Sequence, residues 1–249
     1  FYNELCIEGI QLNNAVAHHK YALSLIFNKI NRNENDFVIA RQHLEKAIQQ
    51  GFTLSYFSLA RLLNEHFKEN DLALKTAKEG AEKGDKYSMC LLGYFITYGI
   101  GTKKDRQKGV PIMIQSGVEQ FYELFATEIG LYYLEKNELK NSNENNNNND
   151  NNDDDLKNSF YWFEKAYILN KTKATINNYA LCFVNGIYVQ KDIEKAKNIF
   201  TDGAKRGDSN SMYHLAHILE ETDPIQSIEY YKKAAELGHP NSQSHYNLM

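Results

Sequence analysis

The chain has 249 residues, of which 42% are hydrophobic and 24% charged, a composition typical of globular proteins and not of disordered ones. Its formal net charge of −4 provides no basic field for binding nucleic acid or anionic lipid. Three prolines exclude collagen-like and proline-rich proteins, and no apolar run reaches the roughly 18 residues that a membrane-spanning helix needs.

A repeated pattern runs from Asn14 to His239. Each copy has an acidic residue, a small residue four positions later, and in most copies a glycine 11 positions after the small one. An acid stabilises the start of a helix by accepting hydrogen bonds from free N–H groups, and a glycine ends it in a left-handed conformation. The pattern therefore predicts six helices, which we call the B helices, with their small residues at Ala40, Ala73, Gly109, Ser159, Ala196 and Ser227.

The predicted acidic caps precede these helices one by one. They are Asp36, Glu69, Asp105, Asp155, Asp192 and Asp223. The glycines expected to end the B helices are Gly51, Gly84, Gly207 and Gly238.

A second helix, the A helix, is predicted before each B helix, and the first of them covers residues 14–29. The A helices are marked by a bulky residue followed by a small one, with further apolar residues three and four positions away. These pairs are Leu59-Ala60, Leu92-Gly93, Ile129-Gly130, Tyr179-Ala180 and Leu215-Ala216. The chain is thus predicted to be all-α, with about six antiparallel helix pairs and no sheet. Cys6 and Gly9 are typical of the end of an earlier B helix and residues 240–249 of the start of a seventh A helix, as in a segment of a longer solenoid.

Residues 141–155 form a low-complexity tract rich in Asn and Asp. The tract holds five acidic residues and no basic one, so the rest of the chain has 28 basic and 27 acidic residues. Such a composition cannot form a packed core. We therefore predict a disordered insert in the loop between the A and B helices of the fourth pair.

The residues offer little support for catalysis. Three cysteines without a CxxC spacing predict neither a zinc framework nor a disulfide scaffold. His214, His217 and Glu221 have the spacing of half a metal site, but the same spacing is typical of a solvated helix face, which we favour. We predict no catalytic residue, no cofactor, no metal and no enzymatic activity.

Three segments resemble Sel-1-like repeats, which are relatives of tetratricopeptide repeats. They are YYKKAAELGHPNSQSHYNL at 230–248, the loop YGIGTKKD at 98–105, and the loop NGIYVQKD at 185–192, in which Tyr188 replaces the second glycine of the family. The resemblance implies a single right-handed α/α superhelix over residues 1–249 with a concave face lined by A helices. Proteins of this kind are similar in serving as adaptors that assemble complexes, including ubiquitin ligases of endoplasmic-reticulum quality control.

Positions three before, one after and four after the small residue of an A helix form one stripe, which by analogy lines the concave groove. An apolar, aromatic stripe suits an extended peptide or a helix of a partner protein. The alternative is that its leucines belong to the core. The candidate partner-binding residues are Phe57, Arg61, Tyr94, Thr97, Leu131, Leu181, Tyr213 and His217.

The sequence thus favours a non-catalytic scaffold or adaptor that binds proteins or peptides, without nucleic-acid binding and without membrane insertion of this segment. The alternative is a regulatory repeat region of a larger enzyme, such as a kinase or a ligase. Unpaired cysteines favour the cytoplasm. The lumen of the endoplasmic reticulum is the alternative, if the full-length chain carries a signal peptide.

Overall fold

A computed structural model describes residues 9–27, 33–117, 123–142 and 152–248. Within these ranges the chain forms helices joined by turns and short connections, and no strand is present. The predicted all-α repeat architecture is confirmed. The chain divides into two compact units, Phe1–Val118 and Glu119–Met249. The continuity of one solenoid over residues 1–249 stays a prediction.

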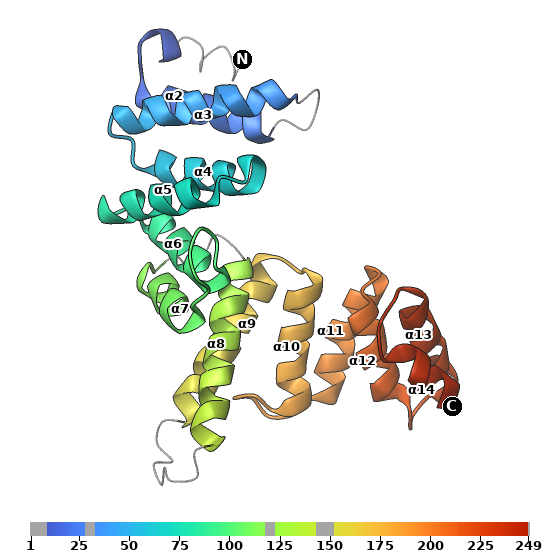
Figure 1. The fold of residues 1–249 in the computed structure, drawn as a ribbon. Coiled ribbons are helices and arrows are strands. Elements are labelled where there is room, and N and C mark those ends of the chain that lie inside the picture. The colour runs from blue at the N-terminus through green and yellow to red at the C-terminus, as the bar shows by residue number, and fades with distance from the viewer. Residues whose placement is uncertain (1–8, 28–32, 118–122, 143–151, 249) are drawn as a thin grey trace. The chain divides into compact units, whose positions relative to one another are not determined.

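The described part of the first unit contains three helix pairs, each made of an A helix and a B helix that contact each other (Figure 1). The A helix of the second pair is extended by a π-helical turn, η1 (Leu63–Phe67). The pairs are α2 (Ala15–Phe27) with α3 (Glu34–Gln49), α4 (Leu54–Leu62) with α5 (Asn70–Glu82), and α6 (Lys86–Tyr98) with α7 (Arg106–Gln115).

The described part of the second unit repeats this arrangement in three further pairs and ends in one additional helix, α14 (Ser242–Leu248), which packs against the B helix before it. The first helix in the fourth pair is longer than the other A helices. The pairs are α8 (Glu123–Ser142) with α9 (Asn152–Leu169), α10 (Lys173–Asn185) with α11 (Ile193–Lys205), and α12 (Ser209–Leu219) with α13 (Pro224–Glu236).

Three of the predicted acidic caps are confirmed. Each of these carboxylates accepts a hydrogen bond from the backbone N–H three residues ahead, at 2.8–3.1 Å, and they belong to Asp105, Asp192 and Asp223. The predicted glycine ends are also confirmed, because each of these glycines has φ between 76° and 84°, a range that side chains disfavour. They are Gly51, Gly84, Gly207 and Gly238.

Of the other three predicted caps, Asp36 and Asp155 were wrong in detail, and Glu69 is confirmed in its position only. Asn33 caps α3, and the Asp36 carboxylate accepts a hydrogen bond from the backbone N–H of Asn33 in a capping box. Glu69 occupies the cap position of α5 but makes no capping bond with its side chain. Asp155 lies within α9, which already begins at Asn152.

The small residues of the repeat lie where the two helices of a pair come closest. Those predicted for both the A and the B helices are buried. In the third pair, a Cβ added to Gly109 would lie 2.5 Å from the carbonyl oxygen of Gly93, a distance that excludes any larger residue. In the sixth pair, the Ser227 hydroxyl donates a hydrogen bond to the carbonyl of Ala216 at 2.8 Å.

Two of the B helices also pack closely on the A helix that follows them. This contact was not predicted from the sequence. Asp208 caps α12, where its carboxylate accepts hydrogen bonds from the N–H and the hydroxyl of Ser211 at 3.0 and 2.5 Å. Asp85 and Ser88 make the same two bonds at the start of α6. A Cβ on Gly203 of α11 would lie 2.1 Å from the Ser211 hydroxyl, so glycine permits this close contact.

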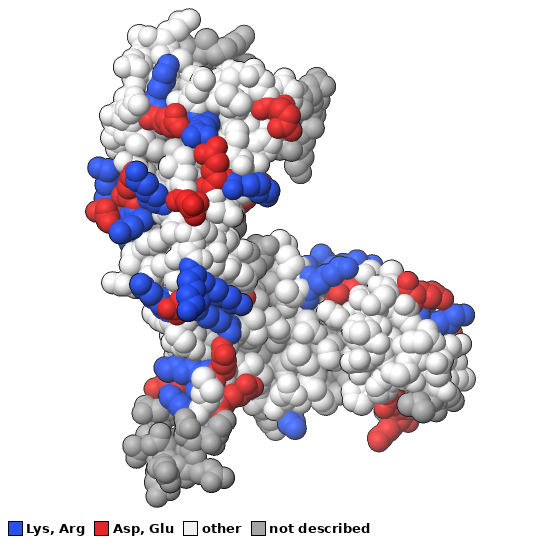
Figure 2. All heavy atoms as spheres, viewed as in Figure 1, with Lys and Arg blue, Asp and Glu red and all other residues white. Residues whose placement is uncertain are grey.

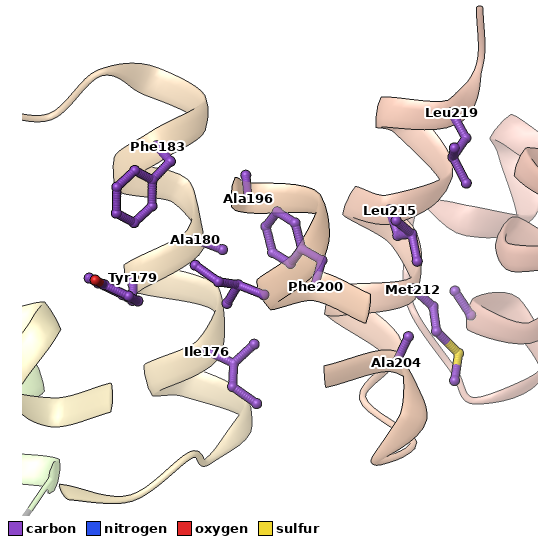
Figure 3. Packing of buried hydrophobic residues seen from close by; sticks show 12 residues of the cluster. Ile176, Tyr179, Ala180, Phe183, Ala196, Phe200, Ala204, Met212, Leu215 and Leu219 are labelled. Atoms are coloured by element: carbon purple, nitrogen blue, oxygen red, sulfur yellow. The ribbon is translucent and has the colours of Figure 1, made fainter. Parts of the chain in front are cut away.

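The core of the second unit is a layer of side chains from four consecutive helices, α10 to α13. Figure 3 shows Ile176, Ala180 and Phe183 on α10, Phe200 on α11 and Leu215 on α12 within one cluster. Phe200 is fully buried, and its ring lies between the helices before and after its own. Each helix pair therefore completes the core of its neighbour, as expected for a repeat protein.

The predicted insert 141–155 is narrower than the sequence suggested. Its first residues, 141 and 142, belong to α8 and its last, 152–155, belong to α9, while residues 143–151 lie outside the described residues. The reason is an ion pair that the composition could not reveal. Buried Asp155 binds Lys136 at 3.0 Å and also Lys140, and both lysines lie on α8.

Candidate partner-binding face

In the first unit, three predicted partner-binding residues lie half-exposed on consecutive A helices that contact each other. On α4, the guanidinium carbon of Arg61 lies 5.8 Å from the centre of the Phe57 ring, and Arg61 also pairs with Glu65. On α6, the ring centre of Tyr94 lies 4.6 Å from that of Tyr98, which is 40% exposed. Flat aromatic surfaces of this kind lose little side-chain entropy on binding.

Thr97 occupies a different place from the one that its stripe position suggested. Its side chain is 1% exposed, and its hydroxyl donates a hydrogen bond to the carbonyl of Gly93 at 2.8 Å. The same hydroxyl would lie 2.3 Å from a Cβ on Gly109. Thr97 therefore packs inside the α6–α7 pair, and a partner could not reach it without opening that pair.

In the second unit, the predicted residues lie on α8, α10 and α12, which contact one another in sequence. Leu131 is half-buried. Leu181 and Tyr213 are also half-buried, and they pack against the core cluster, so they serve partly as core residues. His217 is the most accessible of the four, with 62% of its side chain exposed.

Tyr213 belongs to a cluster of rings at the α12–α14 end of the second unit. Its ring stacks on that of His239 at 4.2 Å, and its hydroxyl lies 3.3 Å from Nε2 of His245 on α14. The ring of His245 stacks in turn on Tyr231 at 5.1 Å. In this segment, the spacing that defines the stripe on the other A helices falls on Ser244. His245 was therefore not predicted from the sequence.

Glu220 is the carboxylate at the centre of this ring cluster. Its Oε1 atom lies 3.1 Å from Nδ1 of His217 and accepts a hydrogen bond from the Tyr231 hydroxyl. Burial opposes the charge on Glu220, but the hydrogen bonds from Tyr231 and His217 outweigh it and lower the pKa of the carboxyl group. His217 therefore pairs with Glu220, and not with the Glu221 that the sequence analysis considered.

Charge is distributed unequally between the two kinds of helix. The A helices α2, α4, α6 and α10 each carry a single Lys or Arg and no acid, and α12 carries no charged residue apart from histidine. The B helices α3, α5, α11 and α13 carry four or five charged residues each. The exceptions are α8 among the A helices, with six charged residues, and α7 among the B helices, with two. Figure 2 shows wide uncharged areas on the visible face of the second unit, with charged side chains gathered toward its margins.

No chemical centre emerges from the described residues. They contain no group of three His, Cys, Asp or Glu side chains that could hold a metal ion, and His214 stacks on Phe200 at 4.9 Å. Cys90 and Cys182 are buried free thiols, and burial raises the pKa of each to about 12, so neither is a reactive thiolate at neutral pH. None of the described helices combines the length and the hydrophobicity needed to cross a bilayer.

The comparisons with solved structures found several repeat proteins. A Sel1 repeat protein from Oxalobacter formigenes is 18% identical with a TM-score of 0.61, over 91% of this chain and 89% of that one. The protective antigen c5321 of uropathogenic Escherichia coli, which has an SLR fold, is 20% identical with a TM-score of 0.59. That alignment covers 98% of this chain but 58% of the E. coli protein, so the chain spans little more than half of its length.

Human IFIT1, in a complex with m7Gppp-AAAA, is 14% identical with a TM-score of 0.51, over 96% of this chain and 55% of that one. At such identities these likenesses establish the fold alone. A search of the curated proteins found no match.

The family model described as Sel1 repeat matches five segments of the chain. They are residues 32–52, 86–110, 154–171, 175–208 and 209–239, which together make up more than half of the sequence. Two of the segments cover the α10–α11 and α12–α13 pairs, and the other three cover α3, α6 with the start of α7, and most of α9. The chain belongs to the Sel1 repeat family.

Proposed function

We propose that the chain is a scaffold that binds segments of partner proteins along its A helices. The bound segments are low in charge. Sel1 repeat proteins generally mediate protein–protein interactions. The observation that carries the proposal is the distribution of charge: α4, α6, α10 and α12 each carry at most one Lys or Arg, whereas the B helices α5, α11 and α13 carry four or five charged residues. Aromatic side chains are at least partly accessible on α4, α6 and α12, at Phe57, Tyr94 and Tyr213. The few residues that dominate the binding energy at protein interfaces are enriched in Trp, Tyr and Arg.

The proposed contacts are those that remain accessible. They are Phe57, Arg61 and Tyr94 in the first unit, and Leu131, Leu181, Tyr213 and His217 in the second. A surface with so few charges recognises its partner through packing and hydrogen bonds. Salt should therefore affect the affinity little, because screening weakens only interactions between charges.

Peptides selected on the purified chain from a display library test this proposal. We expect peptides of low net charge, with a Kd that changes less than about twofold between 0.1 and 0.5 M salt. Replacing the exposed His217 by Ala should weaken peptides bound to the second unit about fivefold, and the matched change Lys232→Ala on α13 should leave their affinity unchanged. Selection of strongly charged peptides with salt-dependent binding would contradict the proposal.

An adaptor subunit of a ubiquitin ligase is the first assembly to test, since the Sel-1-like repeat resemblance points to such complexes. Reconstitution with a candidate ligase should raise the ubiquitination of a bound partner without any activity of the chain alone. Because the IFIT1 neighbour holds a capped RNA, m7Gppp-AAAA serves as the control ligand. Binding of that RNA at the A helices in preference to peptides would overturn the proposal.

A further inference from the structure

Buried imidazole rings attach helix α2 to the rest of the first unit. His18 and His19 on α2 are only 2% and 9% exposed. Nδ1 of His18 lies 2.7 Å from Nδ1 of His43 on α3, and Nδ1 of His19 lies 2.9 Å from the Ser55 hydroxyl on α4. The polar contacts of α2 with both neighbouring helices therefore run through histidines.

The contact between His18 and His43 requires that they share one proton. A hydrogen bond between two Nδ1 atoms forms when one ring donates and the other accepts, so the accepting ring must be neutral. Protonation of both rings removes the acceptor and places two positive charges side by side. His18 has no spare partner for a charged form, because its Nε2 atom is buried without a hydrogen bond.

The groups around the pair do not compensate a positive charge. Lys46 on α3 is the charged residue that acts on both rings, and it has the same sign as a protonated histidine. The ring of Tyr21, which is neutral, meets that of His43 edge-on at 4.9 Å, and the neighbouring His19 contacts the neutral Ser55 hydroxyl on α4. Burial and Lys46 lower the pKa of His18, and burial, His18 and Lys46 lower the pKa of His43. Burial alone lowers the pKa of His19.

We propose that the first helix pair is an acid-sensitive latch, in which protonation of His18 and His43 releases α2 from α3 and α4. Release exposes the buried side of α2, which includes Ala22 and the two histidines. The helices α4 to α7 keep their own packing, because they form pairs among themselves. The first unit would thus expose this surface at acidic pH and bury it again near neutral pH.

The sign of the effect follows from proton linkage. A histidine in the released helix takes up its proton near pH 6.5, whereas the buried forms do so only at lower pH. The closed latch is therefore fully stable above about pH 6.5 and weakens as the pH falls. For each proton taken up on opening, the opening equilibrium constant rises by up to about tenfold per pH unit.

Hydrogen exchange of the full chain at pH 7.5 and 5.5, corrected for the chemical exchange rate, tests the latch. We expect the amides of α2 to exchange at least about tenfold faster at pH 5.5, with the amides of α10 as an internal reference that does not change. Equal corrected rates for α2 at both pH values would overturn the proposal.

The double change His18→Gln with His43→Gln supplies the matched variant, since two amide side chains can share a hydrogen bond and do not titrate. Most of the acid response of α2 should disappear in it, and His217→Gln in the second unit should leave the response intact. An unchanged acid response in the double variant would contradict the latch. If that variant does not fold, imidazole titration by NMR in the native chain decides: both rings must titrate below pH 6.5, together with the opening of α2.

Discussion

Asp208 and Asp192 each cap the N-terminus of a helix, but Asp208 is buried and Asp192 is exposed. Asp192 is exposed and makes one capping bond, at 2.8 Å to the N–H of Lys195. Asp208 is 1% exposed and receives both the N–H and the hydroxyl of Ser211. Removing an exposed cap costs about 1 kcal/mol, whereas removing a buried acceptor also leaves its donors without a partner, at a further cost of about 1–3 kcal/mol.

We therefore expect Asp208→Ala to lower the free energy of unfolding by about 2–4 kcal/mol and Asp192→Ala by about 1 kcal/mol, in urea unfolding monitored by circular dichroism. The two losses of stability can be compared directly, because the residues cap neighbouring helices of one unit. Equal losses would show that burial adds nothing to the Asp208 cap.

Single residues also show what the sequence could and could not predict. Asp105, Asp192 and Asp223 were predictable as caps, because local backbone groups alone satisfy them. Asp208 was not, because its importance comes from the close approach of Gly203 on another helix. The partner-binding residues divide in the same way: His217 is accessible as predicted, whereas Thr97 is enclosed by contacts that only the folded pair creates.

Among the elements, the α8–α9 pair depends on charge more than the others do. Asp155 is buried at the start of α9, and Lys136 and Lys140 reach it from α8. Burial alone would raise the pKa of Asp155, but the hydrogen bonds from Lys140 and Lys136 outweigh it and hold the pKa below its ordinary value. The ends of α8 and α9 could not be predicted, because the Asn/Asp-rich composition gives no sign that Asp155 binds the two lysines of α8.

Replacing Asp155 by Asn keeps the shape of the side chain and removes its charge. We expect the free energy of unfolding to fall by about 1–3 kcal/mol at pH 7, the usual contribution of hydrogen bonds to a charged group. A lowered carboxyl pKa contributes stability above the unfolded pKa near 3.9, and that stability is lost as the pH falls further. Native and variant chains should therefore converge in thermal melts as the pH approaches 3, and a constant difference would contradict this account.

On the scale of the whole molecule, repetition explains why the fold could be predicted and the partner could not. Small residues, acids and glycines recur at regular positions because each helix pair must pack on the next. The same packing requirement is therefore visible several times in one sequence. The exposed residues of the A helices face no such constraint. Phe57, Tyr94, Leu131 and Tyr213 occupy equivalent or neighbouring positions of the stripe but differ in chemistry, as a surface adapted to one particular partner would.

Hydrogen exchange of the chain with and without a selected peptide tests the central claim most directly. The charge distribution predicts that bound peptide slows exchange in the A helices of at least one unit, α4 and α6 or α10 and α12, and leaves α3, α5, α11 and α13 unchanged. Slower exchange confined to the charged B helices would contradict the account, because partners would then bind the opposite side of each pair.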